Sequence, residues 1–331
     1  MHRIWKIGGR QTAAILAVSV FITFTLTVGR TFLLTENLEN VARQVSLDAP
    51  AVFGQTIVLI AGGIDISVGS VMAMAAALAI GLQPYGTATA VMLALLFGLM
   101  IGALNGLLVT KGRILPFVAT LGTMSVIRGA LLTYTHQAPL SGLDDNFAWW
   151  GGGSIGIVPI PLLITLALLL LLTGFLRWTR AGRNFYAIGG NREAAYLAGI
   201  AVLRCEFLAY VISGTLAALG GVMLASRLNS ATVQLGNDTA LLSISAALVG
   251  GASLLGGRGR ITGAFLGVLA LGMLTNGMDL LGVQTYYQIA IRAAILIGVV
   301  ALDAFTRNFA RRMATSAAAA AQLALSGDKT N

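Results

Sequence analysis

Long apolar runs separated by short polar segments make up most of this chain. A helix that crosses a bilayer needs about 20 predominantly apolar residues, so the runs predict an all-α polytopic membrane protein with about ten transmembrane helices. Three runs, at 49–61, 68–82 and 239–251, are short for a full crossing, and we expect some helices to be tilted, broken or re-entrant. The number of crossings then falls at roughly 8–10. The predicted spans are 12–28, 49–61, 68–82, 88–109, 116–134, 159–176, 206–226, 239–251, 261–278 and 286–304.

The polar segments between the runs differ in charge. Lys and Arg are retained on the cytoplasmic side of a membrane protein. The segments 30–48 and 136–158 are rich in carboxylates, and the second also carries Trp149 and Trp150, which suit a membrane–water interface. We therefore expect these two segments to be outer loops and both chain termini to be cytoplasmic. The positive charges concentrate at residues 1–11, 110–115, 177–204, 252–260 and 305–331.

This pattern predicts a single transmembrane domain over residues 12–304. A basic cytoplasmic head (1–11) precedes it, and a basic, Ala-rich cytoplasmic tail (305–331) follows it. The first apolar run ends in TVGRTF without the small-residue cleavage site of a signal peptide, so we expect a retained first span. Pro116 begins the fifth span, because proline fits the first turn of a helix.

Composition supports a membrane protein and excludes other classes. Hydrophobic residues make up 57% of the 331 residues and charged residues only 10%, whereas a soluble domain has about 25% charged residues. The net charge of +9 does not indicate nucleic-acid binding, because the arginines form no basic face with interleaved aromatics. A single cysteine, Cys205, excludes an internal disulfide. The two histidines lie far apart in the sequence, so we predict no metal site.

The longest polar interruption on the basic side is residues 177–204, which we name the arginine-rich loop. It carries five arginines and one glutamate, a local charge of +4, and includes GRNFYAIGGNREAAYLAGI. Two other segments are rich in glycine: GGIDISVGS at 62–70 and LVGGASLLGGRGRITG at 248–263. Neither GGRGR nor Gly189-Gly190 fits the GxxxxGK(S/T) pattern of a phosphate-binding loop, so no nucleotide site is predicted in this chain.

These three segments carry a resemblance to a known family. The chain between about residues 32 and 303 resembles the permease subunits of bacterial ABC sugar importers of the ribose/xylose/autoinducer-2 class, in the branched-chain amino acid/ribose-type permease family. The resemblance implies import of a pentose- or hexose-like solute across the bacterial inner membrane by alternating access. It implies three kinds of partner: a second permease subunit, identical or homologous, a periplasmic sugar-binding protein, and cytoplasmic ABC ATPases. It also implies that this chain has no catalytic site and no cofactor, since ATP and Mg²⁺ bind the ATPases.

The resemblance places the ATPase contact in the arginine-rich loop. A helix around residues 191–198 is expected to enter a cleft of the ATPase, with Tyr196 and Leu197 buried there and the nearby charges setting its orientation. The alternative is that the loop only orients the protein in the membrane. The predicted ATPase-coupling residues are Arg183, Asn191, Arg192, Glu193, Ala194, Ala195, Tyr196, Leu197 and Gly199.

The two glycine-rich segments predict an inner hairpin or gate on the same side. Gly62-Gly63 permits a tight turn, and Asp65 can cap the helix that follows, with Ser67 as a second candidate cap. The alternative is that Asp65 pairs with an arginine and latches the gate. Gly250-Gly251 ends the eighth span as Gly62-Gly63 ends the second, which indicates a weak relation between two halves. The predicted gate residues are Gly62, Gly63, Asp65, Ser67, Gly250, Gly251 and Arg258.

Sparse polar side chains inside the spans predict a translocation path, since sugars need hydrogen-bond partners. The alternative for each amide and hydroxyl is a bond to a neighbouring helix or to its own backbone. Arg128 and Arg292 are costly within a span, and each either faces protein or water or snorkels to the interface. The path candidates are Gln55, Thr56, Asn105, Thr123, Arg128, Ser245 and Asn276.

The chain departs from the family pattern at two places. Ribose-type permeases usually carry a Glu-x-Asp pair before the glycines of the eighth span, where this chain has Ala240 and Leu242. They usually have methionine where Gln55 stands. These departures leave open which sugar is carried and whether the two permease subunits are identical.

An ion-coupled secondary solute carrier is the alternative function. Such a carrier needs carboxylates within the membrane as relays, but Asp65, Glu206, Asp279 and Asp303 all fall at span ends. A membrane enzyme fits less well, because the sequence offers no Ser-His-Asp set and no paired carboxylates inside a span.

Overall fold

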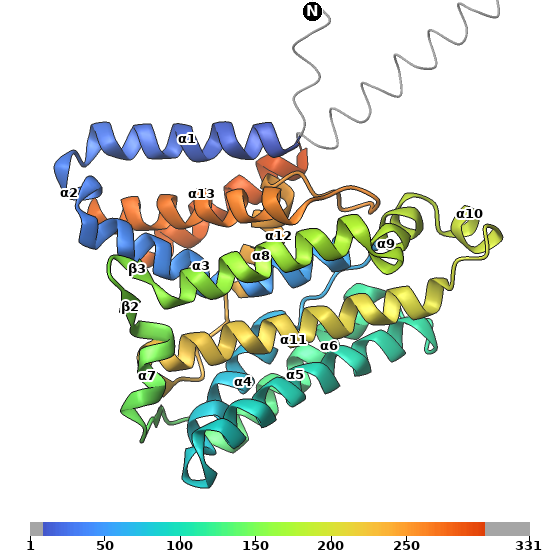
Figure 1. Ribbon diagram of the computed structural model, residues 1–331, viewed down its shortest axis with the longest axis horizontal. Helices are drawn as coiled ribbons and strands as arrows, with labels where there is room; N and C mark the ends of the chain where they lie inside the picture. Colours follow the sequence, from blue (N-terminus) through green and yellow to red (C-terminus); the bar gives the residue numbers. More distant parts are fainter. Residues whose placement is uncertain (1–8, 302–331) are drawn as a thin grey trace, which may run out of the picture.

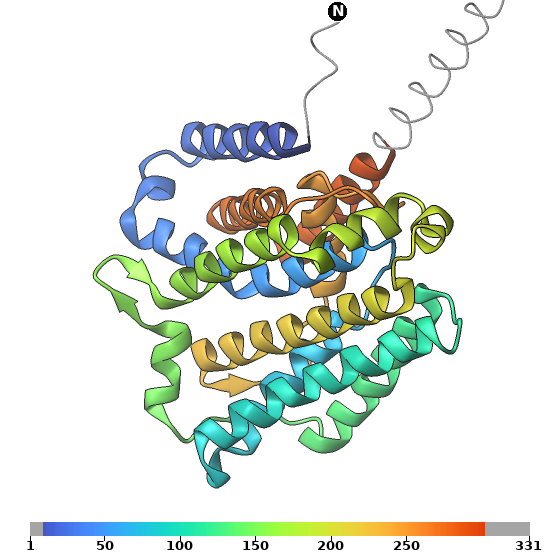
Figure 2. The same cartoon turned by 45° about the vertical axis from the view of Figure 1, so that its right-hand side comes forward.

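The computed structural model describes residues 9–301. Its long helices lie side by side with their axes in roughly one direction, as Figure 1 and Figure 2 show. One end of the bundle carries α9 (Arg180–Gly190) and α10 (Arg192–Leu197), and we name it the α10 end. The opposite end carries α7 (Asp145–Gly152) and the antiparallel strands β2 (Ser154–Ile155) and β3 (Val158–Pro159), and we name it the α7 end.

Within the described residues, five helices are long and apolar enough to cross a membrane: α5 (Thr87–Thr110), α6 (Pro116–Thr135), α8 (Ile160–Trp178), α11 (Val202–Leu228) and α13 (Ile261–Leu280). Shorter apolar helices accompany them in α1 (Gly9–Thr27), α4 (Val68–Gly81) and α12 (Thr239–Val249), and at Thr285–Ala301. The other elements are α2 (Arg30–Leu33), the long α3 (Thr35–Ile60), the 3-10 turn η2 (Gln83–Tyr85), and β1 (Leu140–Ser141) paired antiparallel with β4 (Ser230–Ala231).

Each apolar run that was predicted to be a span lies almost entirely on one of these helices, and residues 302–304 of the last run lie outside the described residues. The helical, multi-span architecture is therefore confirmed, while the number of true crossings stays a prediction. The two pairs of two-residue strands are a small departure from the predicted all-α fold. The tail (305–331), Asp303 and most of the basic head (1–11) lie outside the described residues.

The segment 30–48 corrects the prediction of an outer polar loop. Most of it is helical, because α3 begins at Thr35 and continues without interruption to Ile60. An apolar stripe explains the difference: Val41, Val45 and Ala49 recur at every fourth residue, and all three are buried. The charged residues of this stretch occupy other faces of the same helix, so the mean polarity of the segment concealed its periodicity.

The arginine-rich loop is a second correction. Residues 177–204 contain the end of α8, all of α9 and α10, and the start of α11 at Val202 rather than at 206. Thr179 caps α9 with a hydrogen bond from a first-turn amide at 3.0 Å, and Asn191 caps α10 in the same way at 3.0 Å. The short helix expected around 191–198 is present as α10.

The predicted outer segment 136–158 folds into β1, α7 and β2 at the α7 end. Asp144 caps α7, and its carboxylate also accepts a hydrogen bond of 2.6 Å from the Thr87 hydroxyl at the start of α5. The Thr87 hydrogen bond lowers the pKa of Asp144. Trp149 and Trp150 are 50% and 58% exposed, as side chains at a membrane–water interface would be.

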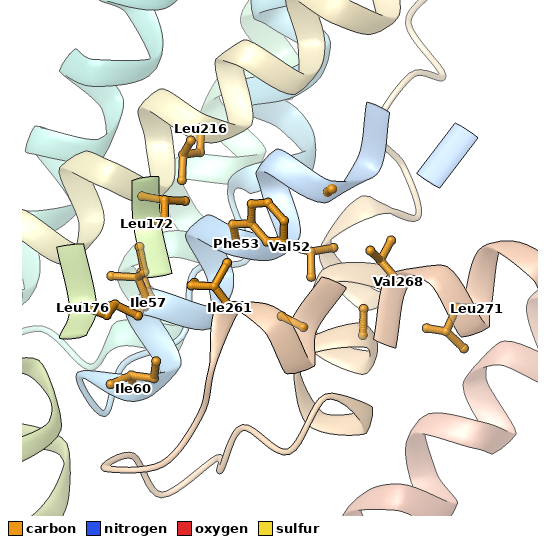
Figure 3. Packing of buried hydrophobic residues seen from close by; sticks show 14 of the residues in the cluster. Val52, Phe53, Ile57, Ile60, Leu172, Leu176, Leu216, Ile261, Val268 and Leu271 are labelled. Carbon is orange, nitrogen blue, oxygen red and sulfur yellow. The ribbon is translucent and has the colours of Figure 1, made fainter. Parts of the chain in front are cut away.

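Helix α11 lies in the middle of the bundle and packs against α3, α4 and α5. Its approach to α5 depends on Gly98 and Gly214, since a methyl group on either would overlap the backbone carbonyl of the other. Lipid supplies little hydrophobic force between helices, so close backbone contact stabilises them by dispersion. Figure 3 shows a hydrophobic cluster to which α3, α8, α11 and α13 contribute Val52, Phe53, Ile57, Ile60, Leu172, Leu176, Leu216, Ile261, Val268 and Leu271.

Helices α3 and α12 end with the same backbone motif. The amides of Gly62 and Gly63 donate to carbonyls in the last turn of α3, and those of Gly251 and Ala252 do so in α12, all at 2.9 Å. Gly62 and Gly251 have φ values of 90° and 89°, a region that favours glycine. The relation between the two halves is therefore present, but it pairs Gly62 with Gly251 and Gly63 with Ala252, one residue away from the predicted alignment.

Helices α4 and α12 begin at one point inside the bundle and run in opposite directions from it. Gly69 in the first turn of α4 and Gly236 just before α12 touch so closely that a methyl group on either would overlap the carbonyl of the other. From this junction α4 runs to the α7 end, where Gly81 meets Tyr134, whereas α12 runs to the α10 end. At 1.5 Å per residue the two helices are only about 21 Å and about 17 Å long. Each therefore crosses part of the bundle, which explains the short runs at 68–82 and 239–251.

Candidate functional site

Three glycine-rich segments meet at the α10 end. The Gly257 amide donates a hydrogen bond of 2.9 Å to the Ile60 carbonyl at the end of α3. A methyl group on Gly189 of α9 would overlap that same carbonyl, and one on Gly256 would overlap the backbone of Gly62. The prediction that the arginine-rich loop and the two glycine-rich segments share one side is thus confirmed, while the cytoplasmic location of that side stays a prediction.

Helix α10 projects from this end with apolar side chains exposed. Ala195 is buried against the bundle, whereas Tyr196 and Leu197 are 71% and 78% exposed. Gly199 follows with φ 79°, so the chain turns sharply back into α11. Tyr196 and Leu197 are therefore free to contact a partner.

Two of the three charged residues in the predicted ATPase-coupling set, Arg183 and Arg192, bond within the chain. The Arg192 guanidinium holds both carboxylate oxygens of Glu206 in α11, through Nε at 2.7 Å and Nη2 at 3.2 Å. These hydrogen bonds raise the pKa of Arg192. Arg183 donates to the Trp178 carbonyl at 3.1 Å, and Glu193 is exposed. The two arginines, which were expected to orient the loop in an ATPase cleft, position α9 and α10 on this chain.

The GGRGR segment is attached to α9. The Tyr186 hydroxyl donates to the Gly259 carbonyl at 3.0 Å, and burial raises the pKa of Tyr186. Arg258 itself is exposed, and its carbonyl accepts a hydrogen bond from the Ser253 amide. The segment therefore presents the Arg258 side chain at the α10 end.

Asp65 is buried in the break between α3 and α4, residues 61–67, which we name the helix break. Its Oδ1 accepts hydrogen bonds from the Ser67 amide at 3.0 Å and the Ser67 hydroxyl at 2.6 Å, and its Oδ2 accepts one from Ser213 at 2.9 Å. The Ser67 hydroxyl accepts a hydrogen bond from the Asn105 side chain at 2.8 Å. Ser67 is the N-cap residue of α4, but its hydroxyl makes no capping bond.

Within the described part of the chain, Asp65 forms no ion pair with an arginine, so the alternative of an arginine latch is wrong. Its carboxylate instead joins the helix break to α11 and, through Ser67, to α5. This is a cluster of polar groups around one carboxylate, in which every hydrogen bond to Asp65 comes from a neutral donor.

Three of the path candidates bond their own helices. Thr56, Thr123 and Ser245 each donate to the carbonyl four residues earlier, at 2.7, 2.9 and 2.6 Å. Such bonds satisfy a hydroxyl inside an apolar bundle without any solute. The hydrogen bonds of these three side chains therefore fit the alternative, in which each hydroxyl bonds its own backbone and does not line a path.

Asn276 and Asn37 exchange side-chain hydrogen bonds of 3.0 and 2.8 Å between α13 and α3. This reciprocal amide pair joins two helices, so the contacts of Asn276 are those of a residue that stabilises helix packing rather than of one that lines a path.

We expect Asn276→Ala and Asn37→Ala each to lower the stability of the detergent-solubilised protein, and the double variant to cost less than the sum. The coupling energy should be about 1 kcal/mol, as for other hydrogen bonds between membrane helices. A double-mutant cycle on unfolding midpoints measures it. If the stability losses of the two single variants were additive, or if Asn276→Ala changed solute affinity without losing stability, Asn276 would again be a candidate for lining the path.

The two intramembrane arginines have protein partners. Arg128 donates to the carbonyls of Val233 and Leu235, at 2.5 and 3.4 Å, in the segment that leads to α12. Arg292 pairs with Asp238 at 3.4 Å, at the start of the same helix. Both arginines therefore hold the beginning of α12.

Gln55 and Asn105 remain as path candidates with unpaired polar atoms. Gln55 is fully buried, and neither its amide nitrogen nor its oxygen has a hydrogen-bond partner within the described structure; the Asn105 oxygen has none either. An unpaired buried polar group costs about 1–3 kcal/mol. The packing of the bundle alone does not account for these two side chains.

Two acidic residues, Glu206 and Asp238, form the ion pairs of this region with Arg192 and Arg292, and neither pair was predicted from the sequence. Glu206 lies 14 positions after Arg192, a separation that does not indicate a contact within one helix. The two side chains meet because α10 folds back on α11. Asp238 is an acid close to the positions where the family usually has its Glu-x-Asp pair, and that proximity was a usable signal. The described residues contain no group of three or more His, Cys, Asp or Glu side chains that would hold a metal ion.

Comparison with known proteins identifies the family. The family model described as "Branched-chain amino acid transport system / permease component" matches residues 37–300. The chain is 40% identical to the ribose import permease protein RbsC of Bacillus subtilis (strain 168), over 87% of this chain and 91% of that protein. It is 34% identical to the D-allose transport system permease protein AlsC of Escherichia coli (strain K12), over 88% and 90%. It is 32% identical to the L-arabinose ABC transporter permease protein AraH of Azospirillum brasilense, over 94% and 92%.

No solved structure matches the chain. The family match covers almost all of the described bundle, from the start of α3 to the last helix. This chain therefore belongs to the family of branched-chain amino acid transport system permease components.

Proposed function

We propose that this chain is the transmembrane permease subunit of an ABC importer for a sugar or sugar-like solute of the pentose or hexose class. The relatives above are named for the transport of ribose, D-allose and L-arabinose. The observation on this chain that carries the proposal is α10, a capped helix whose Tyr196 and Leu197 side chains are exposed at the α10 end. Large apolar side chains presented together outside an apolar bundle suit a protein partner.

In this proposal the chain is a multi-pass protein of the bacterial inner membrane, with both termini and the α10 end in the cytoplasm. A second permease subunit completes the path, a periplasmic sugar-binding protein delivers the solute, and ABC ATPases bind at α10. ATP and Mg²⁺ belong to the ATPases. Closure of the ATPases moves α10, and the spans then switch access from one side of the membrane to the other.

The proposed path is best supported at Gln55 and Asn105. Among the described residues, the Gln55 amide group and the Asn105 side-chain oxygen have no protein partner. These atoms can exchange hydrogen bonds with sugar hydroxyls as they pass, without the loss that breaking an existing bond would bring. Ser245 lines a largely apolar groove with Asp238, Leu242 and Arg292, but its hydroxyl already bonds the Leu241 carbonyl, so it is a weaker candidate than Gln55 and Asn105.

Tyr196→Asp and Leu197→Asp test the docking of the ATPase. Each would bury an unpaired carboxylate in the ATPase cleft, which should weaken binding by about 2 kcal/mol or more, roughly 30-fold. The measurement is the amount of ATPase subunit that co-purifies with the tagged permease when the two are co-expressed, together with uptake of D-ribose, D-allose and L-arabinose by the cells.

Leu143→Asp is the matched control. Leu143 is 73% exposed, as much as Leu197, but it lies at the α7 end, so co-purification should not change. Unchanged co-purification in the two α10 variants would contradict the docking proposal. Uptake by the permease alone in liposomes under a proton gradient would instead favour the ion-coupled carrier.

A further inference from the structure

One face of α11 carries three polar side chains, Glu206, Tyr210 and Ser213, at spacings of four and three residues. Such spacings place side chains on a single face of a helix. The Tyr210 hydroxyl donates to the Ile64 carbonyl at 3.4 Å, and the Ser213 hydroxyl donates to Asp65 at 2.9 Å. Two of the three side chains therefore hold the helix break.

The third side chain of this face connects α11 to α10. The two carboxylate oxygens of Glu206 each accept a hydrogen bond from the Arg192 guanidinium. The Glu206 side chain is only 13% exposed, while that of Arg192 is 62% exposed. A two-point bond between a planar guanidinium and a carboxylate fixes orientation as well as distance. The pair therefore links the orientation of α10 to the N-terminal part of α11.

Apart from this pair, α10 is held to α11 by a short connection. The connecting residues 198–201 include Gly199 at φ 79°, and Ala195 of α10 is buried in the core cluster. Among the described residues, Arg192–Glu206 is the ion pair between these two helices. This pair is therefore the contact that fixes the orientation of α10 relative to α11.

The helix break has space beside it at this point. Glu206 and Tyr210 line a small, partly open cavity of about 40 Å³ together with Gly62, Gly63 and Pro116. A methyl group on Gly63 would overlap the Tyr210 hydroxyl, so the ring and the break are in direct contact. If α11 shifts at Tyr210, either the helix break moves as well, or the contact between Tyr210 and Gly63 is lost and the cavity becomes larger.

We propose that the Arg192–Glu206 pair is the positioning contact through which movement of α10, driven by the bound ATPase, reaches the helix break by way of Tyr210 and Ser213. Arg192, Glu206 and Tyr210 are then positioning residues that act on the break and not on the solute. The inference rests on the proposed function, since α10 must bind the ATPase for the pair to transmit anything.

The test uses the permease co-purified with its ATPase in liposomes, with hydrogen exchange of residues 61–67 followed by mass spectrometry, with and without ATP and vanadate. In the wild type, trapping with ATP and vanadate should change exchange in the break. Glu206→Gln should retain the ATPase and its hydrolysis of ATP, but reduce that change about tenfold. Tyr210→Phe, which removes only the hydroxyl that donates to Ile64, should reduce it as well. The charge exchange Arg192→Glu with Glu206→Arg should restore at least half of the wild-type change.

Arg204→Gln is the control, because Arg204 is an exposed arginine in the same turn of α11 as Glu206. The inference is overturned if the change in exchange persists in Glu206→Gln, or if the exchanged pair recovers nothing. Loss of the ATPase from Glu206→Gln would also overturn it, by making the pair part of the docking surface. If the wild-type permease binds no ATPase, the proposed function itself fails.

Discussion

Leucine in place of Gly214 is expected to prevent the stable packing of α11 against α5. The new side chain would meet the backbone of Gly98 and Gly102, including the Gly98 carbonyl, and a backbone cannot move aside as a flexible side chain can. Overpacking of a core usually costs about 1–3 kcal/mol and occasionally more, and here we expect about 3 kcal/mol or more. The measurement is the unfolding midpoint in detergent, together with the amount of folded protein recovered from membranes.

Gly122→Leu is the matched control. Gly122 also lies within a helix, α6, but a side chain added there meets no atom within 4 Å. Its unfolding midpoint should stay close to that of the wild type. If the two variants were equally stable, close contact between α5 and α11 would not be what holds the centre of the bundle together.

Asp65→Ala is expected to be the most damaging change in the helix break. It would leave three buried donors, the amide and hydroxyl of Ser67 and the hydroxyl of Ser213, without their acceptor. Each unpaired buried donor costs about 1–3 kcal/mol, so the total should reach about 3 kcal/mol or more. Thermal unfolding in detergent and hydrogen exchange of residues 61–67 measure the loss.

Asp65→Asn separates hydrogen bonding from charge. Its remaining oxygen can accept from Ser67, and its new amide can donate to the Ser213 hydroxyl, so most of the stability should return. Asp145→Ala, which removes an exposed carboxylate at the α7 end, should have little effect. An alanine variant as stable as the wild type would show that the cluster around Asp65 does not hold the break.

Apolar runs predicted the helices well. In a bilayer the backbone N–H and C=O groups of such a run have no water to bond, so a helix is the simplest structure that pairs them. The first half of α3 was missed because Val41, Val45 and Ala49 bury one face while charged residues occupy the others. A search for periodicity rather than for mean hydropathy would have found it. The caps at Thr179 and Asn191 are local signals of the same kind, and they divide the arginine-rich loop into two helices.

The contacts that define the candidate site were not predictable in the same way. Asp65 bonds to Ser213, which lies 148 residues further along the chain, and Asn276 bonds to Asn37 across 239 residues. No local sequence pattern indicates such pairs, because they depend on which helices become neighbours in the folded protein. The charge pattern and the resemblance to a family predicted the short helix α10 and a shared side for the three segments, both of which the structure has, but they could not assign Arg192 to Glu206.

The part-length helices α4 and α12 constrain the order in which the protein can assemble in the membrane. A helix of about 17 Å cannot span about 30 Å of hydrocarbon, and its free backbone groups cannot be left in lipid. The first turn of α4 is synthesised long before the segment of Gly236 that packs on it. The packing around the first turn of α4 is therefore complete only once the segment of Gly236 has been inserted, and a chain that ends before Gly236 lacks this contact.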